Sequence, residues 1–450
     1  MPFFLLFDFL LFDFDSFDFK TSPMYIYSMK IAYICSGTGD AFYCENCVRD
    51  NALISGLRAL GHDVVIIPMY LPVEDNDSEG GVAPVMFGAV RLYLIDKFPL
   101  LKRIPEKALR ALDHRRVLDM AASFASSTRA GGNEEMTISM IAGENGPFAD
   151  EFDKSAEWLK QLKPDLVFLS NAFLLGIASA IKAKFSVPIV CMLQDEHVWV
   201  DSSAPEYRAK IWGAVADKRR FADALCAHSN WFREKIAAPL DMPANGISLA
   251  PLGVDPAKYA VASAASGAIS IGYISRLCRD MGMHTLVDAY CQLLKNSDRE
   301  RPPLLEFCGG STKDDAKTIR DSRRKISAAH GVMRIHRRFD LQTRSAFLST
   351  LSLLSVPAQT SIAFGGFITE AMATGVPVVQ PDDGGFSEVI AETRAGLLYS
   401  PNTPEALAEA LEKAIRDDAA RRSMSEAGRK AVMGKYNNVE MARAAVASLD

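Results

Sequence analysis

The feature that most constrains the fold is a series of short, continuous apolar runs that alternate with amphipathic segments. Residues 30–35 (KIAYIC), 63–70 (DVVIIPMY) and 165–170 (DLVFLS) are examples of these runs. Strands that are apolar on both faces are typical of parallel sheets covered by helices on both sides. The alternation therefore predicts an α/β fold in which helices connect parallel strands.

The alternation occurs in two series, and a stretch rich in Pro, Gly and small residues separates them at 251–268 (PLGVDPAKYAVASAASGA). Two similarly built halves joined by a linker predict two Rossmann-like domains that face each other across a cleft. Ligands of such sheets bind at the carboxyl ends of the strands, and interdomain clefts are favoured sites. The expected divisions are a leader at 1–28, an N-terminal domain at 29–255, a C-terminal domain at 256–435 and a C-terminal helix at 436–450 that packs back on the N-terminal domain.

The composition narrows the class of partner. The 450 residues carry a formal net charge of −5, which argues against nucleic acid as the main partner because nucleic-acid binding needs a basic face. Several of the eight cysteines lie inside apolar runs such as 187–193 (VPIVCML), where cysteine behaves as a small buried hydrophobe. This placement predicts a reducing, cytoplasmic setting rather than a disulfide framework. Basic clusters such as 217–223 (DKRRFAD) leave open a peripheral contact with the inner face of a membrane.

The first residues of the chain do not fit the α/β pattern. Residues 1–19 (MPFFLLFDFLLFDFDSFDF) are apolar but interrupted by aspartate, and they have no basic segment and no small-residue cleavage site. They are therefore a poor signal peptide and a poor membrane span. A strand begins abruptly after Met29, so we expect Met29 to be the true start of the protein. The alternative is that the leader is an interfacial anchor.

A glycine-containing turn follows the first strand. In 35–40 (CSGTGD), Gly37 and Gly39 would let the backbone approach a phosphate or a sugar closely. Phe42 stands where a nicotinamide-binding fingerprint would have its third glycine, which argues against that cofactor. The alternative interpretation is a plain strand-to-helix turn.

A C-x-x-C pair follows the glycine turn. Cys44 and Cys47 lie at the predicted start of a helix, where a thiol pKa is lowered and a redox pair could form. A zinc site would need two further ligands, and the sequence offers neither a second C-x-x-C nor a nearby histidine pair. Structural packing is the alternative that we favour.

Two further polar groups follow predicted strands. The run 192–199 (MLQDEHVW) places Gln194, Asp195, Glu196 and His197 at a strand's carboxyl end, where they could hold sugar hydroxyls or act as acid and base. The alternative is a capped loop. Arg276 follows the first strand of the second series and could hold a diphosphate bidentately, or form a surface ion pair.

Taken together, these segments resemble glycosyltransferase family 4, whose members are retaining enzymes with the two-Rossmann GT-B architecture. The resemblance covers nearly everything after Met29, and the last of its segments is the most specific. The segments at 43–53 (YCENCVRDNAL) and 187–199 (VPIVCMLQDEHVW) also look like a bacterial branch of this family. The main segments are 61–68 (GHDVVIIP), 247–255 (ISLAPLGVD), 271–290 (IGYISRLCRDMGMHTLVDAY) and 365–390 (GGFITEAMATGVPVVQPDDGGFSEVI).

The resemblance implies roles for residues that match the family pattern. Arg276 matches an arginine that binds the donor diphosphate, but Met281 stands where the partner lysine would be. Glu370 matches a glutamate that binds the nucleotide ribose, and Ile362 replaces the glutamate, eight positions earlier, that contacts the transferred sugar. Arg276 and Glu370 are the expected catalytic residues.

The remaining expected contacts follow from the same resemblance. Gly384 and Gly385 match a glycine turn whose amides face the donor, and Glu388 matches the glutamate that follows the turn. Two histidines usual in the first domain are absent. The expected donor contacts are Gly37, Gly39, Arg276, Glu370, Gly384, Gly385 and Glu388. The residues that stand in the histidine regions, and are expected to contact the acceptor or the sugar, are Ser170, Asn171, Gln194 and Asp195.

The expected function is that of a cytoplasmic retaining glycosyltransferase. It would move a sugar from a nucleoside diphosphate-sugar to a glycan, glycolipid or natural-product acceptor, with the acceptor on the N-terminal domain and the donor on the C-terminal domain. The donor is a co-substrate, and neither a metal nor a further cofactor is implied. Losing one preorganised donor of positive charge lowers rates by about 10²–10³-fold. Met281 and Ile362 therefore keep two alternatives open: an impaired relative that binds a nucleotide sugar or a partner as a regulatory subunit, and a nucleotide-sugar epimerase or hydrolase.

Overall fold

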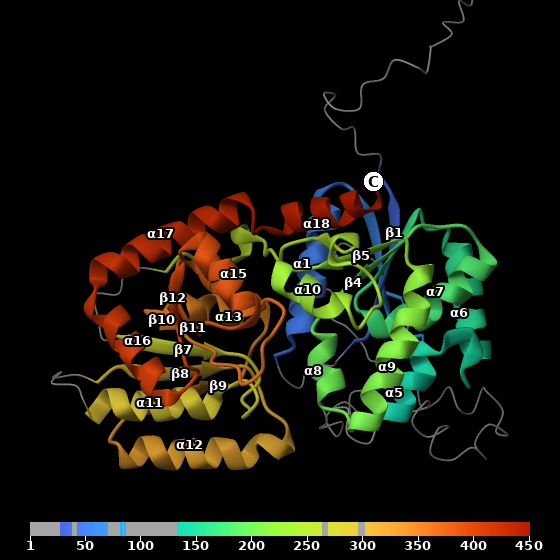
Figure 1. Ribbon diagram of the computed structural model, residues 1–450. Coiled ribbons are helices and arrows are strands. Elements are labelled where there is room, and N and C mark those ends of the chain that lie inside the picture. The colour runs from blue at the N-terminus through green and yellow to red at the C-terminus, as the bar shows by residue number, and fades with distance from the viewer. Residues whose placement is uncertain are drawn as a thin grey trace, which may run out of the picture.

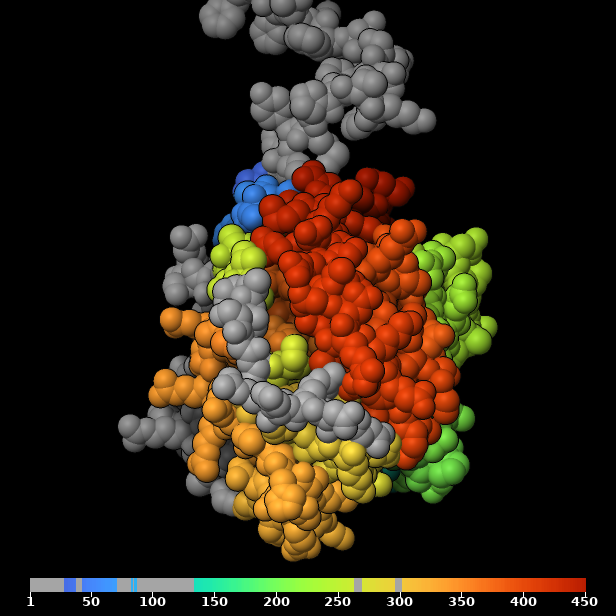
Figure 2. Space-filling view, turned by 90° about the vertical axis from the view of Figure 1, so that its left-hand side faces the viewer, coloured from blue at the N-terminus to red at the C-terminus, as the bar shows by residue number. Residues whose placement is uncertain are grey.

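The computed structural model describes residues 28–37, 43–70, 82–83, 85–86, 133–262, 269–295 and 302–450. The predictions made for Gly39 and for residues 1–27 of the leader lie outside these ranges. The described chain forms two α/β domains that lie side by side (Figure 1). Figure 2 views the second domain end-on, with α16 and α17 in red and α12 at its lower edge.

The first domain contains a six-stranded parallel sheet with strand order β2-β1-β3-β4-β5-β6. Its strands are β1 (Lys30–Cys35), β2 (Asp63–Pro68), β3 (Leu166–Leu169), β4 (Ile189–Met192), β5 (Ala224–Ala227) and β6 (Ser248–Leu249). Its described helices of six residues or more are α1 (Glu45–Ala59), α5 (Glu134–Ile141), α6 (Ala149–Leu162), α7 (Leu175–Lys184), α8 (Glu196–Asp201), α9 (Pro205–Lys218) and α10 (Asn230–Ala237).

Side chains of the first sheet divide between two apolar layers. Ile31 and Tyr33 of β1 pack in the layer that also contains Leu53 of α1. Ala32 and Ile34 point the opposite way, into the layer that contains the apolar side chains of α6 and α7. Successive residues of a strand face opposite sides of a sheet, so a strand covered on both faces must be apolar throughout. This explains the continuous apolar runs in the sequence.

The second domain repeats this architecture, with strand order β12-β11-β10-β7-β8-β9 and parallel pairing throughout. Its strands are β7 (Ser270–Ile274), β8 (Leu304–Cys308), β9 (Val332–His336), β10 (Leu353–Leu354), β11 (Val378–Pro381) and β12 (Gly396–Tyr399). Its helices are α11 (Met283–Lys295), α12 (Ala316–Ala328), α13 (Leu341–Leu348), α14 (Gly366–Thr374), α15 (Gly384–Thr393), α16 (Pro404–Arg416) and α17 (Asp418–Gly434). The prediction of two Rossmann-like α/β domains is confirmed.

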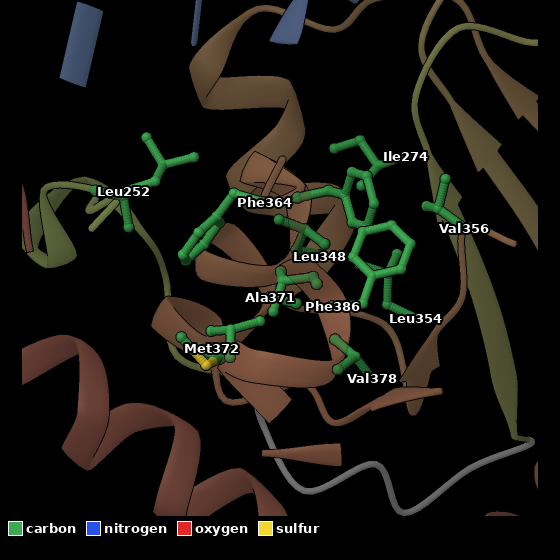
Figure 3. Packing of buried hydrophobic residues seen from close by; sticks show 14 of the residues in the cluster. Leu252, Ile274, Leu348, Leu354, Val356, Phe364, Ala371, Met372, Val378 and Phe386 are labelled. Carbon is green, nitrogen blue, oxygen red and sulfur yellow. The ribbon is translucent and has the colours of Figure 1, made fainter. Parts of the chain in front are cut away.

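The core of the second domain surrounds α14, which is buried along its whole length. Ala371 and Met372 of this helix lie among Leu354, Phe364 and Val378 (Figure 3). A helix that is buried on all sides, as this one is, belongs in the interior of a domain. Its neighbours therefore fix the start of α14, which faces the first domain.

The C-terminal helix α18 (Asn438–Val446) leaves the second domain and lies on α1 of the first (Figure 1). The side-chain amide of Asn438 donates a hydrogen bond to Ser55 Oγ at 3.2 Å. A Cβ atom added to Gly56 would stand 2.0 Å from the carbonyl oxygen of Asn438, so only glycine permits this approach. We propose domain boundaries at 255 and 435 because the chain crosses between the domains near both positions. In the described ranges, no helix has the length and apolar character of a transmembrane span.

Substitution of Gly56 tests the packing of α18. We expect Gly56→Ala to destabilise the protein by about 1–3 kcal/mol, because overpacking of a close contact costs that much. Gly213→Ala on α9 is the matched control, since a Cβ atom there would meet nothing within 4 Å; it should be neutral or stabilise by at most about 1 kcal/mol. Urea unfolding measures both changes. Equal unfolding midpoints for Gly56→Ala and the wild type would show that α18 does not pack on α1.

Candidate active site

The carboxyl ends of β1, β3, β4 and β5 are neighbours at one edge of the first sheet. Polar residues follow each of these strands, as parallel α/β sheets require of a binding edge. Gly37, which follows β1, has a φ of +71°, a conformation that favours glycine. The other residues at this edge are Ser170, Asn171, Gln194, Asp195, His228 and Ser229. The structure thus brings Gly37 together with Ser170, Asn171, Gln194 and Asp195, whereas Gly39 lies outside the described residues.

Asp50 of α1 lies beneath this edge and was not expected from the sequence. Its Oδ1 accepts hydrogen bonds from Tyr33 Oη at 2.8 Å and from Gln194 Nε2 at 2.9 Å. Burial raises the pKa of Asp50 from 3.8 to about 6, although the hydroxyl of Ser170 is among the groups that lower it. Asn171 donates to Ser36 Oγ at 3.0 Å. Gln194 and Asn171 therefore already have partners within the first domain.

Arg49 of α1 organises the carboxylates at the same edge. Its Nη2 lies 2.5 Å from Asp195 Oδ2 and 3.4 Å from Glu45 Oε2, and its side chain is only 1% exposed. Burial acts to raise the pKa of Asp195, but the adjacent Arg49 guanidinium holds it below its usual range. The sequence analysis missed Glu45 and Arg49. Their spacing of four residues on a helix that follows the glycine turn was the available signal.

The first domain holds the segment that leads into α14. Asp195 Oδ1 accepts a hydrogen bond from the backbone N–H of Ala363. His197 Nε2 donates to the carbonyl oxygen of Ser361 at 2.8 Å, and Ser229 Oγ donates to the carbonyl oxygen of Ala363 at 2.6 Å. The binding edge of the first sheet therefore meets the start of α14 directly.

The two apolar replacements lie in or against the core of the second domain. Ile362 is 5% exposed and belongs to that core, and the partly buried Met281 packs against it. Neither side chain carries a charge, and the only polar atom of the two is the thioether sulfur of Met281, a weak acceptor. Both positions therefore lack the charge that the resemblance would imply.

Glu370, the expected ribose ligand, is fully buried on α14. Its Oε1 accepts from Tyr259 Oη at 2.7 Å and from Arg344 Nε at 2.9 Å, and its Oε2 accepts from Tyr43 Oη at 2.8 Å. Burial and the Glu370 carboxylate raise the pKa of both tyrosines. Burial acts to lower the pKa of Arg344, but Glu370 keeps it above its ordinary value. Tyr43 comes from the first domain, so this network also joins the domains.

The other expected donor contacts also have partners within the chain. Arg276 Nε donates to Asp315 Oδ2 at 2.9 Å, and its Nη2 donates to Thr312 Oγ1 at 2.7 Å. Glu388 accepts from Asn230 Nδ2 at 2.8 Å and from the backbone N–H of Trp231 at 3.1 Å.

The expected glycine turn packs against the segment before α14. Gly384 has a φ of +59°. The N–H of Gly385 donates to the carbonyl oxygen of Ile362 at 2.9 Å. A Cβ atom added to Gly385 would stand 2.1 Å from the carbonyl oxygen of Ala363. Glycine at this turn therefore permits a close backbone contact, and one of its amides is already used.

The C-x-x-C pair lies at the start of α1. Cys44 is the N-cap residue, and its Sγ accepts from the backbone N–H of Cys47 at 3.5 Å. Both cysteines are partly buried, and neither forms a disulfide with another described cysteine. Across the described ranges, no group of three or more His, Cys, Asp or Glu side chains is arranged to hold a metal ion.

The buried Asp50 carboxyl group predicts a dependence of stability on pH. Between about pH 4 and 6 the folded protein retains the Asp50 proton while the unfolded chain loses it, so rising pH destabilises the folded state. Relative to Asp50→Asn, the wild type should lose about 2–3 kcal/mol of unfolding free energy across this window. Urea unfolding at several pH values measures the difference. The exposed Asp201→Asn is the matched control, and an Asp50→Asn profile parallel to the wild type would contradict the assignment.

Two family models together match most of the chain. Residues 48–253 match the family described as glycosyl transferase 4-like domain. Residues 260–431 match the family described as glycosyl transferases group 1. The first match falls on the domain that contains Arg49 and Asp195. The second falls on the domain that contains Arg276 and Glu370.

Curated relatives are matched over part of their length. The D-inositol 3-phosphate glycosyltransferase of Corynebacterium urealyticum is 30% identical over 159 residues, which is 35% of this chain and 37% of the relative. The corresponding protein of Jonesia denitrificans is 26% identical over 246 residues, or 50% of this chain and 56% of the relative. The chain therefore matches less than two thirds of the length of these relatives.

Solved structures resemble most of the chain. The Anabaena protein HepE, determined in complex with UDP and glucose, has a TM-score of 0.63 at 15% identity and covers 94% of this chain and 99% of its own. Sucrose-phosphate synthase from Thermosynechococcus elongatus has a TM-score of 0.63 at 17% identity and covers 92% of this chain and 96% of its own. At these identities the likeness shows the fold, and the GT-B prediction is confirmed.

Proposed function

Because the chain belongs to the GT-B glycosyltransferases that pair a glycosyl transferase 4-like domain with a group 1 domain, we propose that it transfers a sugar from a nucleoside diphosphate-sugar. The acceptor is a glycan, a glycolipid or a natural product, and the anomeric configuration is retained. The second domain binds the donor and the first domain binds the acceptor. The setting is the cytoplasm, with peripheral contact at the inner face of the membrane.

The observation that carries the proposal is the meeting of two strand-end edges at the start of α14. Asp195, His197 and Ser229 of the first domain contact residues 361–363, and α14 follows immediately. A helix N-terminus presents unpaired backbone N–H groups and favours an anion. Sugar transfer builds negative charge on the departing diphosphate, and preorganised amides and cations stabilise that charge.

Uridine diphosphate is the donor nucleotide that we propose to test first. HepE of Anabaena was determined with UDP and glucose, and also with UDP-glucose. The D-inositol 3-phosphate glycosyltransferases suggest a phosphorylated polyol as one acceptor to test. A capsular polysaccharide biosynthesis glycosyltransferase of Staphylococcus aureus, 23% identical over 168 residues, suggests a lipid-linked glycan as another.

The test combines binding with turnover. Thermal shift across a panel of nucleoside diphosphates and their sugars should show stabilisation by at least one of them, because a ligand that binds the folded state raises its stability. Release of the nucleoside diphosphate should then depend on the acceptor. Release without acceptor would favour a hydrolase. Binding without release under any condition would identify a relative that binds nucleotide sugars without transferring them.

Arg276 gives a residue-level prediction. Arg276→Met should weaken nucleoside diphosphate binding by about tenfold or more, since a hydrogen bond to a charged group contributes about 1.5–3 kcal/mol. Arg276→Lys should recover only part of the affinity, because lysine keeps the charge but lacks the planar fork. Isothermal titration measures both. Arg324→Met, at a largely exposed side chain of α12, is the matched control, and equal affinities for Arg276→Met and the control would rule out this role.

A further inference from the structure

Five buried side chains of the first domain leave polar atoms without a hydrogen-bond partner near the start of α14. The atoms that have no hydrogen-bond partner among the described residues are Glu45 Oε1, Arg49 Nε and Nη1, Gln194 Oε1, His197 Nδ1 and His228 Nε2. Asp195 forms an ion pair with Arg49 and lies between Gln194 and Glu196 in the chain, two residues before His197. We call these side chains together the Arg49 cluster: Glu45, Arg49, Gln194, Asp195, His197 and His228.

Interactions link the members into one site. Arg49 pairs with both Glu45 and Asp195. Burial and the nearby Arg49 charge lower the pKa of His228 to about 4, so this imidazole is neutral. Its Nδ1 donates to the carbonyl oxygen of Ala250 at 2.9 Å, so its Nε2 is an acceptor. Burial raises the pKa of Glu45 to about 7, although Arg49 and the backbone amide of Gly366, the first residue of α14, act to lower it. The influence of Gly366 places Glu45 against the second domain.

Unpaired buried groups in such numbers need an explanation. Leaving a buried donor or acceptor unsatisfied costs about 1–3 kcal/mol, more for charged groups, and folded proteins contain few of them. This cost is concentrated at one place, because the unpaired atoms lie on the side chains of Glu45, Arg49, Gln194 and His228. The Arg49 side chain is 1% exposed, whereas Glu45 and Asp195 are 13% and 15% exposed. These two carboxylates are therefore the members through which a ligand would reach the cluster.

The mixture of orphaned atoms selects the chemistry of that ligand. Arg49 offers donors, and the unpaired atoms of Glu45, Gln194 and His228 offer acceptors. A phosphate would satisfy Arg49 but would be repelled by the carboxylate of Asp195, whose pKa Arg49 helps to hold low. A cation would satisfy the carboxylates but not Arg49. Hydroxyl groups, each of which donates and accepts, fit all of these atoms at once.

We propose that the Arg49 cluster binds the hydroxyl groups of a sugar ring and so takes over the role lost at Ile362. The cluster's Asp195 contacts the amide of Ala363, the residue next to Ile362. A carboxylate from the first domain thus stands beside the position where the second domain has none. Whether the bound sugar belongs to the donor or to the acceptor is a question that rests on the proposed function. The binding of hydroxyl groups by the cluster does not rest on it.

The experiment compares Glu45→Gln and Asp195→Asn with the wild type in two arms. The first arm measures, by isothermal titration, the dissociation constant of the nucleoside diphosphate-sugar that stabilises the wild type most, and of the matching nucleoside diphosphate. The second arm measures binding of glucose, mannose and myo-inositol, with and without the nucleotide. Glu157→Gln, at an exposed glutamate of α6, is the matched control, and unliganded unfolding midpoints verify that each variant is folded.

The proposal expects both variants to bind sugar about tenfold more weakly while binding the nucleoside diphosphate as the wild type does, in line with the loss of a hydrogen bond to a charged group. Loss confined to the nucleotide-sugar identifies the transferred sugar as the ligand. Loss confined to the free sugars identifies the acceptor. Unchanged sugar binding in both folded variants, or no sugar binding by the wild type in either arm, overturns the proposal. Failure of every nucleotide to bind contradicts the proposed function alone, because the free-sugar arm still tests the cluster.

Discussion

The carboxylate of Asp195 is the contact on which the arrangement of the two domains depends. One oxygen pairs with the buried Arg49 of its own domain, and the other accepts the N–H of Ala363 from the second domain. Removing one partner of a buried ion pair leaves an uncompensated charge, which is strongly destabilising. Asp195 also has a φ of +60°, a conformation uncommon for a residue with a side chain. The backbone is thus held in an unfavourable conformation at the point where the domains meet.

Binding of a donor would therefore be an exchange of partners. A diphosphate at the start of α14 would bind amides at the helix N-terminus, which lie beyond the Ala363 amide that Asp195 already holds. Arg276 would give up its hydrogen bond with Asp315 for one with the donor. Glu370 would likewise give up one of its present partners, which are Tyr43, Tyr259 and Arg344. Only the surplus of the new contacts over the old ones contributes to affinity.

Sequence reasoning found the parts of the site that are local and missed those that depend on distant contacts. Strands and their polar ends follow from short apolar runs, so Gln194, Asp195 and Arg276 could be placed at the edges of sheets. Arg49 is separated from Asp195 by 146 positions, and Tyr43 from Glu370 by 327. Such pairs depend on which helix faces which strand end, and no local pattern encodes that.

The difference between local features and distant contacts also decides what the isoleucine at position 362 means for the site. Within the second domain, Ile362 is a loss, since the side chain lies in the core and offers no acceptor. Across the domain boundary, the adjacent amide of Ala363 is held by a carboxylate from the first domain. A pocket assembled from two domains can move a functional group from one side to the other while its chemistry is kept. Whether a member of this fold retains activity must therefore be argued from both strand-end edges together, because a motif read in one domain records only half of the groups that face the reacting sugar.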